Sequence, residues 1–168
     1  MKEQFTQRLE KIEDVLTKKL PKNFLSDWQW GIFNTAPNQE FSQDEIEKLI
    51  KPCRELLSLG GKRWRPLLQV LCAEYVILNK NGTDAENQIN LENAYNLVPL
   101  VEFVHTASLI HDDIEDGADT RRGKPAAHIT YGVDVAINAG SWLYFAAPEV
   151  LETLPLDEKL KINLYRTF

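Results

Sequence analysis

The chain has 168 residues, of which 43% are hydrophobic and 26% are charged, and its formal net charge at pH 7 is −6. This composition is ordinary for a globular domain and too apolar for a disordered chain, while the negative charge argues against broad attraction to nucleic acid. No apolar stretch reaches the roughly 18 to 20 residues of a membrane span, and residues 1–16 lack the apolar segment of a signal peptide, so we expect a cytoplasmic protein.

The first part of the chain predicts two helices. Apolar side chains recur at three- and four-residue steps over residues 5–20, which is typical of an amphipathic helix, and Pro21 ends it. Residues 22–40 carry aromatic side chains without a clean period, and no element is predicted there. Ser42 and Glu45 fit a capping box, which predicts a short helix that ends before Pro52.

The middle of the chain predicts two more helices. A turn at Gly60–Gly61 leads into a helix over residues 66–78, and its apolar side chains on most sides indicate a central position in the fold. A longer helix is predicted over residues 91–116, with a bend at Pro99.

The last part of the chain predicts a loop over residues 117–125 and then two helices. One helix begins near Asp134 and contains Pro148, and the other follows Asp157 as its cap. Almost nothing in the sequence is typical of a strand, and no linker or repeat divides it. The expected fold is therefore all-α in a single domain, and the two cysteines, Cys53 and Cys72, are expected to be structural thiols.

The most informative motif is the acidic cluster Asp112-Asp113-Ile114-Glu115-Asp116. On a helix, Asp112 and Asp116 project about 40° apart, and like charges in that arrangement repel unless a cation neutralises them. His105 falls within about 20° of both directions, so the three side chains share one face. Carboxylates beside an apolar segment suit Mg²⁺ that also holds phosphate oxygens, whereas an acidic helix end in solvent is the simpler alternative.

Two basic clusters accompany the acids. One follows the glycine pair and the other follows the acidic cluster, and the side chains concerned are Lys62, Arg63, Arg65, Arg121, Arg122 and Lys124. Glycines let the backbone approach an anion, lysine supplies a point charge and arginine supplies paired donors that match phosphate. Each cluster alone could be a solvated basic turn. Together with the acids they describe a site for two anionic groups bridged by a divalent metal.

The sequence GGKRWRP, followed by VEFVHTASLIHDDIEDGADTRRGKPAAH, resembles the trans-isoprenyl diphosphate synthases, also called polyprenyl synthetases. In that family the glycine-lysine motif, a histidine seven residues before the acids, the first aspartate-rich motif and an RRG sequence occur in this order. Family members also carry a second aspartate-rich motif on a later helix, which this sequence lacks. The resemblance implies that residues 1–168 are a single partial domain, the N-terminal half of an isoprenoid-synthase-type helical bundle.

The resemblance also implies roles for the basic and acidic residues of this sequence. The predicted ligands of the acceptor, isopentenyl diphosphate, are Lys62, Arg65, His105 and Arg122. Arg121 is expected to bind the diphosphate of the allylic donor. Asp112 and Asp116 are expected to ligate Mg²⁺, with Asp113 as a further ligand or as support. The predicted catalytic residues are Asp112, Asp116 and Arg121.

These roles imply a prenyltransferase that condenses isopentenyl diphosphate with an allylic diphosphate by metal-assisted ionisation. The resemblance also implies that the enzyme is a homodimer and that this 168-residue chain alone is inactive. In the family, bulky aromatic residues four and five positions before the first aspartate shorten the product. Here those positions hold Ser108 and Ala107, so products of C20 or longer are expected. Two alternatives remain at this point: a class I terpene cyclase, and a non-catalytic partner subunit of a prenyl synthase.

Overall fold

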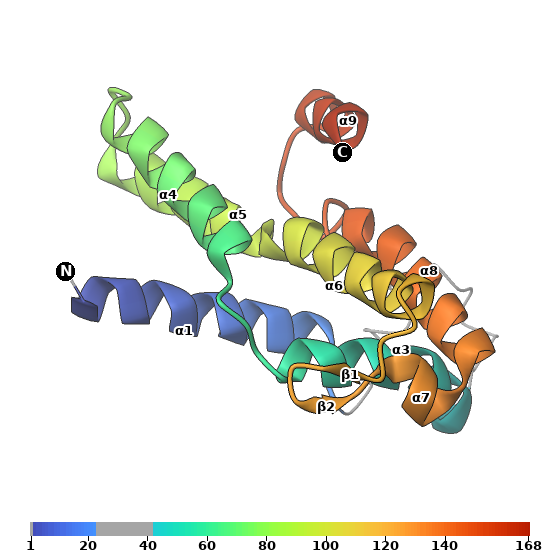
Figure 1. Ribbon diagram of the computed structural model, residues 1–168. Helices are drawn as coiled ribbons and strands as arrows, with labels where there is room; N and C mark the ends of the chain where they lie inside the picture. The colour runs from blue at the N-terminus through green and yellow to red at the C-terminus, as the bar shows by residue number, and fades with distance from the viewer. Residues whose placement is uncertain (1, 23–41) are drawn as a thin grey trace.

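The computed structural model describes residues 2–22 and 42–168, and this part of the chain is mainly helical (Figure 1). The helices are α1 (Lys2–Lys19), α3 (Gln43–Ser58), α4 (Trp64–Leu78), α5 (Asp84–Asn96), α6 (Val98–Glu115), α7 (Ala127–Tyr131), α8 (Val133–Glu149) and α9 (Glu158–Thr167). Two short antiparallel strands, β1 (Thr120–Arg121) and β2 (Lys124–Pro125), form a hairpin between α6 and α7. Among the described helices, none has the length and apolar character needed to cross a bilayer. The all-α prediction is confirmed, whereas the unassigned residues 22–40 lie almost wholly outside the described residues.

Helices α1 and α3 form where the sequence predicts them, but α3 is longer than expected. Ser42 and Glu45 make the predicted capping box, with the Ser42 hydroxyl accepting from the backbone N–H of Glu45. The prediction that this helix ends before Pro52 is wrong, because α3 continues to Ser58. Ile50 and Cys53, on either side of the proline, are both completely buried, and packing against the core holds the helix together despite its missing hydrogen bond.

The predicted helix over residues 91–116 is two helices in the structure. Pro99 is the second residue of α6 and has no N–H to continue the preceding helix, so the chain breaks at Leu97 instead of bending. The first helix, α5, already begins at Asp84 behind a capping box of Thr83 and Glu86. Its early turns are too polar to show an apolar period, which is why periodicity missed them.

The prediction that residues 66–78 form a central helix is wrong for this chain. Helix α4 packs against α1, α5 and α6, which together cover one side of it. On the opposite side its apolar side chains are 42 to 70% exposed, at Leu71, Leu68 and Tyr75. A helix with apolar residues on most sides needs neighbouring helices all round it, and the described part of the chain covers α4 on one side.

The core is centred on α6 and α8, which run side by side in Figure 1. Their close approach depends on Gly140, because a Cβ there would lie 2.8 Å from Nε2 of His111. His111 donates from this nitrogen to the carbonyl oxygen of Ile137 at 3.3 Å. His111 therefore fastens α6 to α8, and α6 in turn carries the predicted site residues.

Candidate functional site

Helix α6 has a buried face and an open face, and the predicted site residues divide between them. Phe103, Ala107, Ile110 and Asp113 are buried in the interior. His105, Ser108, Asp112 and Asp116 are partly or fully exposed on the open side. The structure thus places the predicted histidine ligand and the first and last aspartates on one side, and turns Asp113 inward.

The acidic cluster is linked to the hairpin through Arg121. Its Nε donates to Oδ1 of Asp113 at 2.7 Å, and its Nη2 donates to Oδ2 of Asp112 at 3.0 Å. The hydrogen bond to Asp113 is the main cause that raises the pKa of Arg121. Asp113 is 1% exposed and its second oxygen, Oδ2, has no hydrogen-bond partner in the described structure. Asp113 therefore holds Arg121 beside the exposed carboxylate of Asp112.

The acidic cluster suits a metal that takes only part of its coordination from protein. In residues 2–22 and 42–168, no three acidic, histidine or cysteine side chains converge on one metal position. Asp112 and Asp116 nevertheless offer exposed carboxylates one helical turn apart. Mg²⁺ commonly keeps several waters and binds through one or two carboxylates together with substrate phosphates, so these two residues fit it.

The four predicted acceptor ligands line one small cavity of about 50 Å³. Its walls are Gly61, Lys62, Arg63, Trp64, Arg65, Glu102, His105 and Arg122. These residues come from three places in the chain: the α3–α4 turn with the start of α4, the middle of α6, and the hairpin. The fold therefore assembles Lys62, Arg65, His105 and Arg122 although 60 positions separate the first from the last in numbering.

His105 is a neutral hydrogen-bond acceptor in this cavity. Burial, and then the nearby charge of Arg65, lower its pKa. Nη1 of Arg65 lies 3.0 Å from Nε2 of His105, and because arginine can only donate, that histidine nitrogen carries no proton. The pair fixes one edge of the Arg65 guanidinium and leaves its other donors free to meet an anion.

Arg63 is the residue of this cluster to which the sequence assigned no role. It has left-handed backbone angles, φ 46° and ψ 31°, and a buried side chain. Its guanidinium donates at 2.6 Å to Glu13 of α1, to Glu102 of α6 and to the carbonyl oxygen of Leu57 near the end of α3. The signal that could have revealed this network is Glu102, a single charge within an otherwise apolar helical segment.

Arg122 fixes the hairpin to the same turn. It also has a left-handed backbone, with φ 52°. Its Nη1 donates to the carbonyl oxygens of Leu56, at 3.2 Å, and Gly60. A Cβ on Gly61 would approach Nη2 of Arg122 to 3.2 Å, so glycine at this position gives the arginine its room.

The two residues predicted to set product length occupy different environments. Ala107 is fully buried in the hydrophobic core. Ser108 is half-buried, and its hydroxyl donates to the carbonyl oxygen of His105 at 2.8 Å. Ser108 is therefore the one of the two that faces the open side of α6, and it lies one turn before Asp112.

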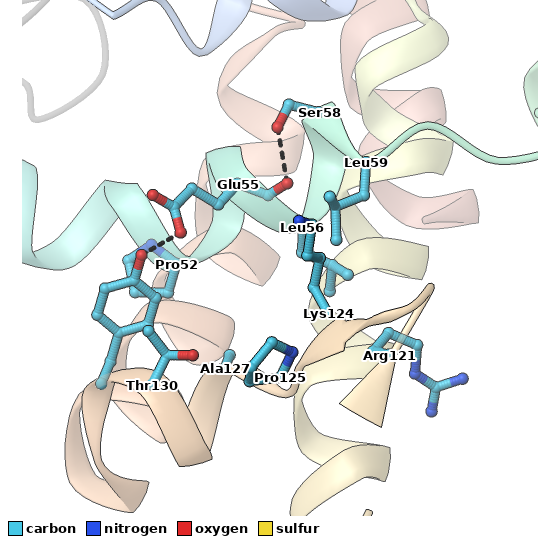
Figure 2. Close-up of a pocket in the computed structure, with 11 residues that line it drawn as sticks. Pro52, Glu55, Leu56, Ser58, Leu59, Arg121, Lys124, Pro125, Ala127 and Thr130 are labelled. Atoms are coloured by element: carbon cyan, nitrogen blue, oxygen red, sulfur yellow. Dashed lines mark hydrogen bonds between the residues drawn. The ribbon is translucent and has the colours of Figure 1, made fainter. Parts of the chain in front are cut away.

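A larger cavity of about 390 Å³ lies between α3, the hairpin and α7 (Figure 2). Its walls are mainly apolar, and among the predicted site residues it includes only Arg121. Figure 2 shows the Arg121 guanidinium directed away from the other lining residues. This cavity is therefore separate from the cluster of cations around His105.

Comparison with known proteins identifies the class to which this fold and site belong. The family model described as polyprenyl synthetase matches residues 46–168. The chain belongs to the polyprenyl synthetase family, as the motifs predict.

Individual relatives agree with this assignment. A geranylgeranyl diphosphate synthase of Methanosarcina mazei is 44% identical over 126 residues, which cover 71% of this chain and 36% of the relative. Among solved structures, an FPP/GFPP synthase of Zymomonas mobilis has a TM-score of 0.70 and 27% identity, over 98% of this chain and 50% of that one. A geranyltransferase of Helicobacter pylori, complexed with magnesium and isoprenyl diphosphate, has a TM-score of 0.65 and 25% identity, over 96% and 46%. The chain spans about a third of the length of the curated relatives it matches.

Proposed function

We propose that this chain forms the first half of the active site of a prenyltransferase that condenses isopentenyl diphosphate with an allylic diphosphate. The observation that carries the proposal is the position of Arg121 and Arg122, which are consecutive in the hairpin. Arg121 contacts the acidic cluster. Arg122 lines the small cavity that Lys62, Arg65 and His105 also line, which we call the cationic cavity. The two proposed anion sites are thereby joined by one peptide unit, which suits a reaction between two diphosphates.

The cationic cavity is the proposed acceptor site. Glu13 and Glu102 both pair with Arg63, and Lys62, Arg65 and Arg122 remain as cations around the cavity. Arginine offers paired donors to phosphate oxygens, and lysine adds a compact charge. Because the neutral His105 accepts from Arg65, the cavity is preorganised to receive an anion and offers no carboxylate without a partner.

The acidic cluster is the proposed donor site. Asp112 and Asp116 would hold Mg²⁺, and Asp113 supports them by fixing Arg121. Bound metal would neutralise the charge that gathers on the allylic diphosphate as its carbon–oxygen bond breaks. Arg121 adds a positive charge at the same place, and it is already oriented by its two hydrogen bonds before the substrate arrives. No side-chain nucleophile is needed, because the acceptor double bond attacks the allylic cation and loss of a proton restores a double bond.

The cationic cavity favours this function over a class I terpene cyclase. A cyclase binds one diphosphate and has no second anionic substrate to hold, whereas this chain provides a separate cluster of cations on the far side of Arg121–Arg122. A non-catalytic partner subunit would not need an exposed Asp112 beside an oriented Arg121.

We also propose that residues 1–168 act as part of a larger, homodimeric enzyme. The relatives are about twice as long as this chain, and apolar side chains such as Leu68, Leu78 and Phe145 are more than half exposed in this chain. Large exposed apolar patches, unlike single exposed side chains, commonly mark an interface. Analytical ultracentrifugation should show the full-length protein as a dimer and residues 1–168 as self-associating material; a monodisperse, cooperatively folded monomer of residues 1–168 would contradict this.

Turnover of the two diphosphates tests the function directly. The full-length protein should release diphosphate and form a longer prenyl diphosphate only when isopentenyl diphosphate, an allylic diphosphate and Mg²⁺ are all present. Asp112→Ala should lower turnover by at least about 100-fold, because one lost ligand at the developing charge costs roughly 3 kcal/mol or more. Cyclised hydrocarbon from the allylic substrate alone would identify a cyclase, and near-normal turnover by Asp112→Ala would refute the donor site.

A further inference from the structure

Arg65 is held between two side chains at the start of α4. Its guanidinium carbon lies 4.5 Å from the centroid of the Trp64 ring. Its Nη1 donates to Nε2 of His105 at 3.0 Å. The aromatic ring thus contacts the guanidinium face, while the histidine fixes one of its edges.

The Trp64 side chain contributes little to the core. Trp64 is 53% exposed, whereas Pro66 and Leu67, the next residues inward along α4, are buried. The first residue of a helix that is already anchored by these neighbours does not need a large aromatic side chain for packing. Trp64 also lines the small cationic cavity, so its side chain lies at the proposed anion site.

Ordering Arg65 in advance favours anion binding. The arginine side chain has five N–H donors, and His105 is the only hydrogen-bond partner of the Arg65 guanidinium within the described residues. The remaining donors are available for phosphate oxygens. A long side chain that is already fixed loses less conformational entropy when the ligand binds.

We propose that Trp64 is a positioning residue of the acceptor site, which holds the Arg65 guanidinium by stacking so that its donors point toward the diphosphate of isopentenyl diphosphate. This inference rests on the function proposed above. Because Trp64 lies on the acceptor side, and Arg121 belongs to the donor side, its removal should affect one substrate and not the other.

The test compares ringless and ring-bearing substitutions in the full-length enzyme. Trp64→Leu removes the aromatic face but keeps apolar bulk, Trp64→Phe keeps a ring, and Tyr75→Leu removes another exposed aromatic further along α4 as a control. Trp64→Leu should raise KM for isopentenyl diphosphate about three- to tenfold, which is the size of one partly desolvated cation–π contact. Its kcat and its KM for the allylic substrate should stay within about twofold, as should all three constants for Trp64→Phe and Tyr75→Leu.

Several outcomes would overturn the inference. An unchanged acceptor KM in Trp64→Leu, an equal rise for both substrates, or equal impairment of Trp64→Phe and Trp64→Leu would each exclude positioning through the ring. Trp64→Met is the second ringless variant if Trp64→Leu does not fold, and failure of both to fold would show that Trp64 is structural. Absence of condensation by the wild-type enzyme would instead refute the proposed function, so the two failures are distinguishable.

Discussion

The buried pair of Arg63 and Glu102 gives the sharpest test of how the site is held. The Arg63 side chain is 1% exposed and that of Glu102 is 3% exposed, whereas Glu13, the other partner, is 45% exposed. Removing one member of a buried ion pair leaves an uncompensated charge and typically costs 3 to 5 kcal/mol, while an exposed pair contributes about 1 kcal/mol or less. We therefore expect Arg63→Met to destabilise the protein by about 3 to 5 kcal/mol and Glu13→Gln by about 1 kcal/mol or less.

Two matched variants separate the buried charge from the other effects of the substitution. Arg63→Met combined with Glu102→Leu removes both charges and keeps apolar volume, so it should recover most of the lost stability. Because Arg63 has a left-handed backbone, Arg63→Gly should be less destabilising than Arg63→Ala by about 1 kcal/mol, since glycine adopts this conformation without strain.

Urea unfolding of the full-length variants, followed by circular dichroism, measures these differences. A typical domain is stable by about 5 to 15 kcal/mol, so the expected loss is large enough to shift the midpoint clearly. A loss below about 1 kcal/mol in Arg63→Met, or a double variant as unstable as the single one, would refute the argument that Glu102 depends on Arg63.

Three further predictions concern single residues of the site. Arg65→Ala should raise KM for isopentenyl diphosphate at least about tenfold while KM for the allylic substrate changes little, and an equal rise in steady-state assays would mean that the substrate assignment is wrong. Folding lowers the pKa of His105 below its value of about 6.5 in the unfolded chain, so the unfolded state binds a proton more readily as the pH falls. The stability contributed by neutral His105 is therefore complete above about pH 6.5 and is lost below it. Between about pH 7.5 and 5.5 the wild type should lose more free energy of unfolding than His105→Gln. Product sizing should find chains of C20 or longer, and Ala107→Phe with Ser108→Phe should shorten them; a C15 product alone from the wild type would contradict this.

The positions of helices could be predicted from the sequence wherever a capping residue and an apolar periodicity agree. The capping box of Ser42 and Glu45 and the cap at Asp157 both form as predicted. The failures have two different physical causes, buried packing in α3 and a polar, capped helix start in α5. Pro52 remains inside α3 because the residues on both sides of it are buried, and the polar start of α5 is helical without an apolar face of its own.

The residues of the proposed site could be predicted from local motifs, but the long-range ion pairs that hold them in place could not. The sequence places Lys62 and Arg65 in one motif and Arg121 and Arg122 in another, and the chemistry of these side chains already points to two anions. Nothing in either motif shows that Arg63 turns inward to α1 and α6, because its partners lie 50 and 39 positions away. Long-range ion pairs of this kind depend on the packing of whole helices, which a local pattern does not encode.

The two arginines with left-handed backbones explain how the chain presents so many cations in one place. Arg63 and Arg122 use their guanidinium groups to bind Glu102 and the carbonyl oxygens of Leu56 and Gly60, so they fasten the α3–α4 turn to α6 and to the hairpin. Without these contacts, the like charges of the three basic residues in the turn would repel one another and destabilise it. Carboxylates and carbonyls behind the turn offset that repulsion, and Arg65 keeps donors that are not used by His105 for the proposed diphosphate ligand.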